Sequence, residues 1–238
     1  MHDSGSDPKA AGITVLSVKT AVHGRVLVRP AADPAAVVVG FHGYAEDAAT
    51  QLERLTAMPG AAEWTCVAVQ GLHRFYRGRT QDTVAGWMTR QDRELAIADN
   101  VAYVDRVIEQ ITQTFPESMP PRHGRVPLVY VGFSQGVAMA FRAGLRGRVP
   151  ADAIVGVGGD VPPELFEDTA VSFPRVLLIR GDRDEWYTAA KLQNDEAGLA
   201  TRSVSVQGLT VEARHEWTPE ISGVIARFLQ ELSLSGSN

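Results

Sequence analysis

The chain of 238 residues has a formal net charge of −5, a hydrophobic fraction of 45% and a charged fraction of 21%. These values are ordinary for a globular protein of one α/β domain, and they leave no basic face for a nucleic acid. We therefore expect a single domain and no nucleic-acid partner.

The beginning of the chain carries no targeting pattern. Residues 1–10 are polar and lack the basic and then apolar layout of a signal peptide, and no apolar run is long enough to cross a bilayer. Cys66 is the single cysteine, so it cannot form an intramolecular disulfide and is expected in the core. We predict a cytoplasmic protein with a disordered tail at 1–10, one domain at 11–232 and a polar tail at 233–238.

Two β-rich stretches come first in the chain. Ile13 to Lys19 and Arg25 to Arg29 flank the turn-prone pair His23-Gly24, a pattern that predicts an antiparallel hairpin. Unbroken apolar runs follow, as is typical of strands that are buried on both faces of a parallel sheet. These runs lie at 35–41, 66–69, 128–131, 153–157 and 176–179.

Amphipathic stretches with helical spacing separate the apolar runs. They predict helices at 47–58, 92–115, 135–145, 188–199 and 219–232. This alternation predicts an α/β fold with a mostly parallel, doubly wound sheet that carries helices on both faces. Ligands of such sheets bind beyond the carboxyl ends of the strands, so the residues that follow each run are the candidates for a site.

The pentad Gly132-Phe133-Ser134-Gln135-Gly136 stands between a predicted strand and a predicted helix. A Gly-x-Ser-x-Gly pentad in this position is typical of a nucleophile elbow, a tight turn that exposes the serine hydroxyl. The backbone N–H of Gln135 would then be a donor to a developing oxyanion. By itself, the short pentad also fits a purely structural turn.

The end of the first central strand offers a second donor. Phe41-His42-Gly43-Tyr44 turns sharply toward a predicted helix, and the backbone N–H of Tyr44 is positioned to pair with that of the pentad. The alternative is an ordinary strand-to-helix turn with Asp47 near the N-cap.

Acidic groups and a histidine follow later strands. Asp182, Asp184 and Glu185 come after the run at 176–179, where an acid can orient a histidine; the alternative is a solvated acidic turn. His215 lies in a loop before the last helix, from which an imidazole can reach a serine. Serine, acid and histidine thus occur in the chain order of α/β-hydrolases.

Motifs for metals and nucleotides are missing from the sequence. No histidine pair has the His-Glu-x-x-His spacing, and one cysteine cannot build a zinc knuckle. Neither a phosphate-binding loop nor a dinucleotide fingerprint occurs. We expect no metal and no cofactor.

These motifs together resemble the phospholipase/carboxylesterase family of serine hydrolases, which includes the acyl-protein thioesterases. The Gly-Phe-Ser-Gln-Gly form is more specific than the general pentad. The resemblance implies a triad of Ser134 as nucleophile, His215 as base and Asp184 as acid, while Asp182 would hold the turn.

The resemblance extends from about Val37 to Leu232. It implies an α/β-hydrolase fold without a large lid domain. It also implies that the backbones of Tyr44 and Gln135 form the oxyanion hole.

Departures from the family pattern concern the substrate. Trp87 lies in a segment where family members usually carry Trp-Phe-Asp, and Trp186 lies where they carry a hydrophobic-Pro pair. With Trp217 and Tyr44, these residues predict an aromatic pocket for a small acyl or aryl group, while core packing is the alternative for each.

One further segment carries three arginines, Arg74, Arg77 and Arg79. It fits recognition of a carboxylate or phosphate on the substrate, and it fits equally a solvated loop paired with acids.

The sequence therefore predicts a serine hydrolase that cleaves carboxylic esters, with short acyl or aryl esters or thioesters as small-molecule substrates, through an acyl-enzyme. The alternatives are a peptidase or acyltransferase on the same triad and a ligand-binding homologue without turnover. Acyl chain length, leaving group, physiological substrate and the choice between monomer and homodimer stay open.

Overall fold

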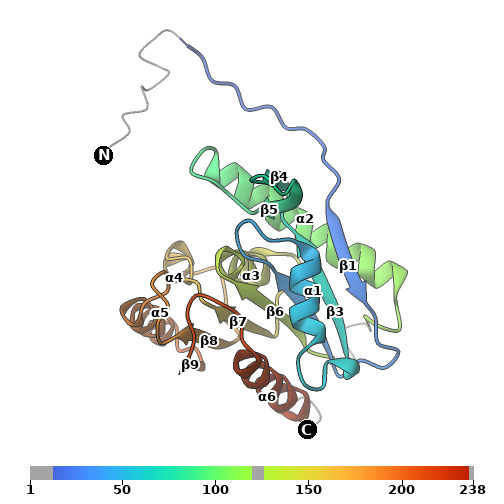
Figure 1. Ribbon diagram of the computed structural model, residues 1–238, viewed down its shortest axis with the longest axis vertical. Coiled ribbons are helices and arrows are strands. Elements are labelled where there is room, and N and C mark those ends of the chain that lie inside the picture. Colours follow the sequence, from blue (N-terminus) through green and yellow to red (C-terminus); the bar gives the residue numbers. More distant parts are fainter. Residues whose placement is uncertain (1–12, 120–125, 236–238) are drawn as a thin grey trace.

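The computed structural model describes residues 13–119 and 126–235. The tail predicted at 1–10 and the last three residues lie outside this part of the chain. Within it, seven strands form one sheet in the order β1-β3-β2-β6-β7-β8-β9. Figure 1 shows helices packed around this sheet. β1 is antiparallel to β3, and every other neighbouring pair is parallel. The expected mostly parallel α/β sheet is confirmed.

The strands of the sheet match the predicted apolar runs closely. They are β1 (Arg25–Arg29), β2 (Ala36–Phe41), β3 (Trp64–Gln70), β6 (Leu128–Phe133), β7 (Ala153–Val157), β8 (Arg175–Gly181) and β9 (Val206–Val211). β2, β3, β6 and β7 are buried at every residue, because helices cover both faces of the sheet.

Helices connect the strands. They are α1 (Ala48–Thr56), α2 (Arg93–Thr114), α3 (Gln135–Arg146), α4 (Glu164–Glu167), α5 (Ala189–Thr201) and α6 (Pro219–Ser235), with a 3₁₀ turn at Ala61–Glu63. The last helix continues three residues beyond its predicted end. Within the described parts of the chain, every helix is too short or too polar to span a lipid bilayer.

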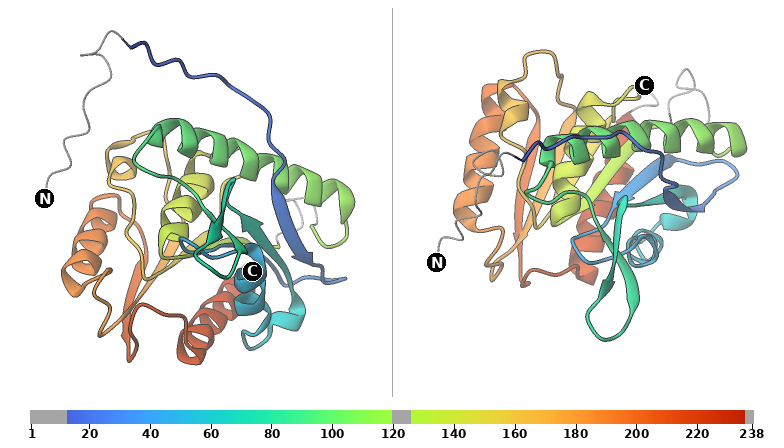
Figure 2. Two further views of the ribbon diagram at one scale, coloured as in Figure 1. Left: turned by 45° about the horizontal axis from the view of Figure 1, so that its top comes forward. Right: turned by 90° about the horizontal axis from the view of Figure 1, so that it is seen from above.

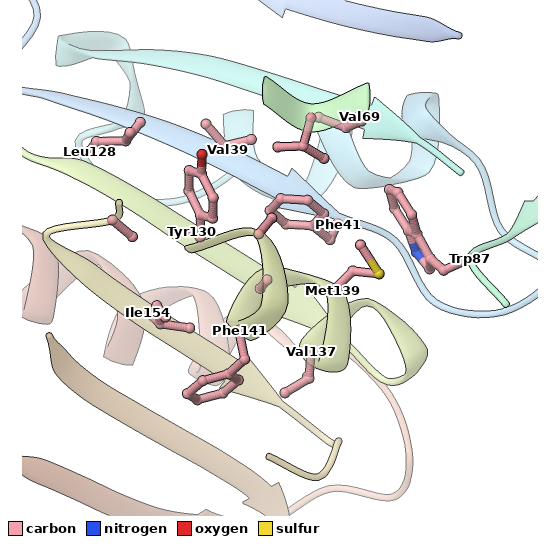
Figure 3. Packing of buried hydrophobic residues seen from close by; sticks show 14 of the residues in the cluster. Val39, Phe41, Val69, Trp87, Leu128, Tyr130, Val137, Met139, Phe141 and Ile154 are labelled. Atoms are coloured by element: carbon pink, nitrogen blue, oxygen red, sulfur yellow. The ribbon is translucent and has the colours of Figure 1, made fainter. Parts of the chain in front are cut away.

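Two hydrophobic cores lie on opposite faces of the sheet. Alternate residues of β2 serve them, because successive side chains of a strand point to opposite faces: Val39 packs with α2 and α3, whereas Val38 packs with α1 and α6. Figure 3 shows the first core, where Phe41 and Tyr130 of the sheet face Met139 of α3.

The predicted N-terminal hairpin is wrong. Residues 13–24 form no strand, and β1 pairs with β3 instead. The Tyr103 hydroxyl donates to the carbonyl of Arg25 at 2.8 Å, and Arg74 donates to the carbonyl of His23 at 2.7 Å. These contacts hold the chain at the start of β1, and the earlier part of the segment runs out from the body (Figure 1).

A hairpin that the sequence did not reveal lies outside the main sheet. It consists of β4 (His73–Arg77) and β5 (Asp82–Gly86), and Figure 2 shows it projecting from the body. It contains two of the three arginines noted above, and the third, Arg79, lies in its turn. Arg77 forms an exposed ion pair with Asp82 at 3.3 Å.

Candidate active site

The central strands create a crevice at their carboxyl ends. From β2 the chain passes to β3 on one side, and it later returns to β6 on the other side. At such a switch point the two loops diverge and leave room for a ligand. The loop that follows β2 begins at His42, and the turn that follows β6 begins at Ser134.

Ser134 occupies a strained turn between β6 and α3. Its φ of 51° and ψ of −120° lie in a region that non-glycine residues rarely adopt. A Cβ atom at Gly132 would lie 2.5 Å from the Gly136 carbonyl oxygen, and one at Gly136 would lie 2.1 Å from that of Phe41. The two glycines of the pentad therefore allow the helix to approach the strands closely enough for this turn.

Three side chains from distant loops meet at the crevice. His215 Nε2 lies 2.9 Å from Ser134 Oγ, and His215 Nδ1 lies 2.9 Å from Asp184 Oδ2. Only 1% of the Asp184 side chain is exposed, compared with 24% of the His215 side chain. The hydroxyl, the imidazole and the carboxylate thus form one hydrogen-bonded chain that leads from the crevice into the protein.

The two candidate acids of the loop after β8 have different partners. Asp184 Oδ1 accepts the backbone N–H groups of Trp186 at 2.8 Å and Tyr187 at 2.9 Å, which leaves Oδ2 for the imidazole. Asp182 Oδ1 instead accepts the backbone N–H of Ala213 at 3.0 Å. Asp182 therefore connects the loop after β8 to the loop that carries His215, but it does not bind the imidazole.

The turn after β2 is held by His42. Because His42 Nε2 accepts the Gly71 N–H at 3.0 Å, the ring proton resides on Nδ1 and is donated to the Gly43 carbonyl at 2.7 Å. Burial lowers the pKa of His42, against the opposing effect of its bond to Gly43, and so favours the neutral ring.

Glu46 and Arg54 also stabilise the turn after β2. Glu46 Oε2 accepts the Gly43 N–H at 2.8 Å, and both carboxylate oxygens bind the Arg54 guanidinium, at 2.6 and 2.7 Å. Burial alone would raise the pKa of Glu46, but Arg54 and the Gly43 N–H together hold it below its ordinary value. The guanidinium also lies 4.4 Å from the ring centre of Phe133.

The three tryptophans expected in the pocket lie in different environments. Trp87 is fully buried; its indole N–H donates to the His42 carbonyl at 2.8 Å, and Figure 3 shows its ring beside Phe41. Trp217 is half-buried and donates to Ser222 Oγ at 2.9 Å. Trp186 is 73% exposed and lines the cavity beside Ser134. Of these three tryptophans, Trp186 alone lines the cavity, because Trp87 fills the core beside the turn after β2 and Trp217 lies outside the lining.

The side chain of Gln135 holds the backbone of Trp87 and Met88. Its Oε1 accepts the Trp87 backbone N–H at 2.9 Å, and its Nε2 donates to the Met88 carbonyl at 3.0 Å. These two bonds attach the segment before α2 to the start of α3.

A cavity of about 320 Å³ lies beside Ser134. Its walls are the segment 158–163, one face of α3, the first residue of α2, and the loops that carry Trp186 and His215. The cationic side chains of Arg93, Arg142 and Lys191 also line it, and the sequence analysis missed all three. The helical spacing of Arg142 from the pentad serine was the signal that could have revealed it.

No group of three or more histidine, cysteine, aspartate or glutamate residues within the described chain could hold a metal ion. Hydrogen bonds among protein groups account for the geometry around Ser134 described above.

A family model described as Phospholipase/Carboxylesterase matches residues 23–233, which is most of the chain. The chain belongs to this family. The expected enzyme class, a carboxylic ester hydrolase, is confirmed with the family. A search of curated proteins finds no significant match in sequence.

Solved structures of esterases share the fold of this phospholipase/carboxylesterase family member. Esterase PE8 is similar with 21% identity and a TM-score of 0.69, over 89% of this chain and 100% of the other. Acyl-protein thioesterase 2 of Zea mays has 18% identity and a TM-score of 0.68 over the same shares. The Bacillus cereus carboxylesterase has 13% identity and a TM-score of 0.67, over 88% of this chain and 94% of the other. These structures share the α/β-hydrolase architecture, and the part of this chain that the structure describes contains no large lid domain.

Proposed function

We propose that the protein hydrolyses small carboxylic esters through an acyl-enzyme formed on Ser134. His215 Nε2 takes the hydroxyl proton as Oγ attacks the ester carbonyl, and it then gives this proton to the leaving alcohol. Asp184 keeps the other ring nitrogen protonated and stabilises the imidazolium. Water then attacks the acyl carbonyl while His215 takes its proton, and the imidazolium returns this proton to Ser134 Oγ as the acyl–oxygen bond breaks and the carboxylic acid leaves. The observation that carries this proposal is the unbroken hydrogen-bonded chain from Ser134 to Asp184.

The oxyanion in this proposal is bound by the backbone N–H groups of Tyr44 and Gln135. Gly43 and Tyr44 share a peptide bond whose carbonyl oxygen accepts a bond from the His42 ring. In a trans peptide the N–H points opposite to the carbonyl, so the N–H of Tyr44 points away from His42. The second N–H belongs to the first residue of α3, where helix amides have no partner within the helix.

Cavity size supports a small acyl group. The volume of about 320 Å³ is at the lower end of the range for small-molecule sites, roughly 300–1,000 Å³. The acyl length that the cavity accepts is measured with a panel of esters of increasing acyl length and one thioester of a short acid. We expect kcat/KM to peak at short chains, and a steady rise toward long chains would contradict the proposed pocket.

The decisive experiment replaces the nucleophile. Ser134→Ala is expected to lower kcat for a short-chain ester by at least about 1,000-fold and to abolish labelling by a fluorophosphonate. Ser205→Ala is the matched control, because Ser205 is exposed and lies in another part of the fold. Retained turnover or labelling of Ser134→Ala would overturn the assignment. Labelling also separates an enzyme from a ligand-binding homologue, whose serine would not react.

A further inference from the structure

The cavity beside Ser134 has an unusual charge distribution. Among the described residues that line it, Arg93, Arg142 and Lys191 are cationic, and Asp160 is the one acid. A cavity suited to a plain alkyl ester needs no such charges, and burial of the Arg142 guanidinium, which is 1% exposed, is costly. The charged groups must therefore serve either the fold or a ligand.

Arg142 shares a helix face with the nucleophile. Ala138 and Arg142 follow Ser134 by four and eight residues, and all three line the cavity. At 1.5 Å per residue, the backbone of Arg142 lies about 12 Å from that of Ser134 along α3. Side chains on a helix lean toward its N-terminus, which brings the guanidinium back toward Ser134. Its Nη1 lies 3.4 Å from the sulfur of Met88, whose carbonyl accepts from Gln135 beside the nucleophile.

The hydrogen-bond partners of Arg142 within the protein do not use all of its N–H donors. Its side chain is 1% exposed, and both Nε and Nη2 bind the same oxygen of Glu164, at 2.8 and 2.7 Å. Nη1 faces the Met88 thioether, which is a weak acceptor. A guanidinium has five N–H donors in a planar fork, so this arrangement leaves donor capacity for a further oxygen ligand.

Arg93 and Lys191 add positive charge to the cavity beside Arg142. Arg93, the first residue of α2, pairs at 3.1 Å with Glu94, which is exposed and points outside the lining of the cavity. Lys191 lies 3.1 Å from Asp160, in an ion pair that is half-exposed and easily rearranged.

We propose that the ester substrate carries a carboxylate, which binds to Arg142 Nη1 with help from Arg93 while Ser134 attacks the ester carbonyl. This inference rests on the function proposed above. The carboxylate belongs either to the acyl part, in a half-ester of a dicarboxylic acid, or to the alcohol part, in an ester of a hydroxy acid. Both kinds of ester place a carboxylate close to the reacting carbonyl, and Ser134 and Arg142 line the same cavity.

Matched ester pairs test the preference and identify the half of the substrate that carries the charge. Monoethyl glutarate is compared with ethyl hexanoate, and O-butanoylglycolate with propyl butanoate, with acid release followed by titration at constant pH. In at least one pair, kcat/KM for the carboxylated ester is expected to exceed that of the neutral one by about ten-fold or more. A preference for the neutral ester in both pairs would overturn the proposal.

Variants on α3 connect the preference to one arginine. Arg142→Met is expected to lower the ratio of carboxylated to neutral kcat/KM by about ten-fold or more. Arg146→Met is the control: Arg146 lies one turn later on α3, outside the cavity lining, and pairs with Asp168 at 3.0 Å. Its ratio should match that of the wild type. If Arg142→Met does not fold, Arg93→Gln replaces it and is expected to lower the ratio several-fold; an unchanged ratio would count against the proposal.

A binding measurement separates this inference from the proposed catalysis. Glutarate and glycolate are titrated by calorimetry into Ser134→Ala, alone and combined with Arg142→Met or Arg146→Met. We expect one of the two acids to bind and the Arg142→Met change to weaken its affinity about ten-fold, with no effect of Arg146→Met. Such binding without ester turnover by the wild type would refute the esterase mechanism and keep the anion site. Binding of neither acid would refute the anion site and leave the esterase mechanism standing.

Discussion

Arg54 and Arg142 are two largely enclosed arginines, with side chains 16% and 1% exposed, and their partners differ. Arg54 places one nitrogen on each oxygen of Glu46 and covers its guanidinium with the Phe133 ring. Arg142 places two nitrogens on a single oxygen of Glu164 and turns its third toward a sulfur atom. The first arrangement matches a bidentate fork, whereas the second leaves donor capacity at the cavity.

Burial alone does not separate an arginine that stabilises the fold from one that can bind a ligand. Arg54 braces the turn at Gly43, because its two terminal nitrogens each bind a different oxygen of Glu46, the acid that accepts the Gly43 N–H. Arg142 is the more buried of the two, yet it lines the cavity. The hydrogen-bonding capacity that remains after internal partners are counted is the better guide to function.

The largest expected effect is the loss of kcat when Asp184 is replaced, compared with Asp182 in the same loop after β8. Asp184→Asn should lower kcat by roughly 10³–10⁴-fold, since the amide cannot hold the correct tautomer of His215. Asp182→Asn should lower kcat by less than about ten-fold, because its oxygen binds a backbone N–H that an amide oxygen also accepts. Steady-state kinetics of both variants with a short-chain ester measures the difference. The opposite ranking would assign the acid role to Asp182.

The second prediction concerns the stability of the two arginine sites. Arg54→Met should lower the free energy of unfolding by roughly 2–4 kcal/mol, because it leaves the carboxylate of Glu46 largely buried and unpaired. Arg142→Met should cost only about 1–2 kcal/mol, because the side chain of Glu164 is 35% exposed and can be solvated. Urea unfolding at neutral pH measures both values. Equal losses would show that the two ion pairs are equivalent in structure.

The third prediction concerns a buried acid behind the cavity. Asp195 Oδ2 accepts both the Val161 N–H at 3.1 Å and the Tyr187 hydroxyl at 2.8 Å, and burial raises its pKa to about 6. Because this pKa lies above the ordinary value of 3.8, the stabilisation by the protonated form is complete below pH 3.8 and is lost as the pH rises through 6.

Asp195→Asn should remove this loss, since an amide oxygen can accept both bonds without a charge. Relative to the wild type, the variant should gain roughly 1–3 kcal/mol of stability between pH 4 and pH 8. Urea unfolding of both proteins at the two pH values gives the difference. A difference that does not change with pH would mean that Asp195 titrates normally in the folded protein.

The smallest effect is expected in the β4–β5 hairpin. Arg77 and Asp82 are each more than half exposed, so their ion pair at 3.3 Å is screened by solvent. Arg77→Ala should change the stability by less than about 0.5 kcal/mol and kcat/KM for monoethyl glutarate by less than about two-fold. A large loss of kcat/KM would place the substrate carboxylate at the hairpin instead of at Arg142.

Local patterns in the sequence determined most of the architecture. The apolar runs predicted the central strands, and the pentad predicted a helix at 135–145 where α3 spans Gln135–Arg146. These features depend on side-chain periodicity and on residues adjacent in the chain, so they can be predicted without knowledge of the fold. The predicted hairpin from Ile13 to Lys19 was wrong: residues 13–24 form no strand, and β1 pairs with β3, a strand much later in the chain.

The tertiary structure decided which side chains act together. The sequence contained two aspartates after one strand, and residue spacing alone did not distinguish them; the fold brings Asp184 to His215 and Asp182 to Ala213. It likewise buries Trp87 beside the turn after β2 and brings Arg142 to the cavity beside Ser134. A residue's periodicity fixes the face on which it lies, but its partners depend on which distant elements the order of strands brings to that face.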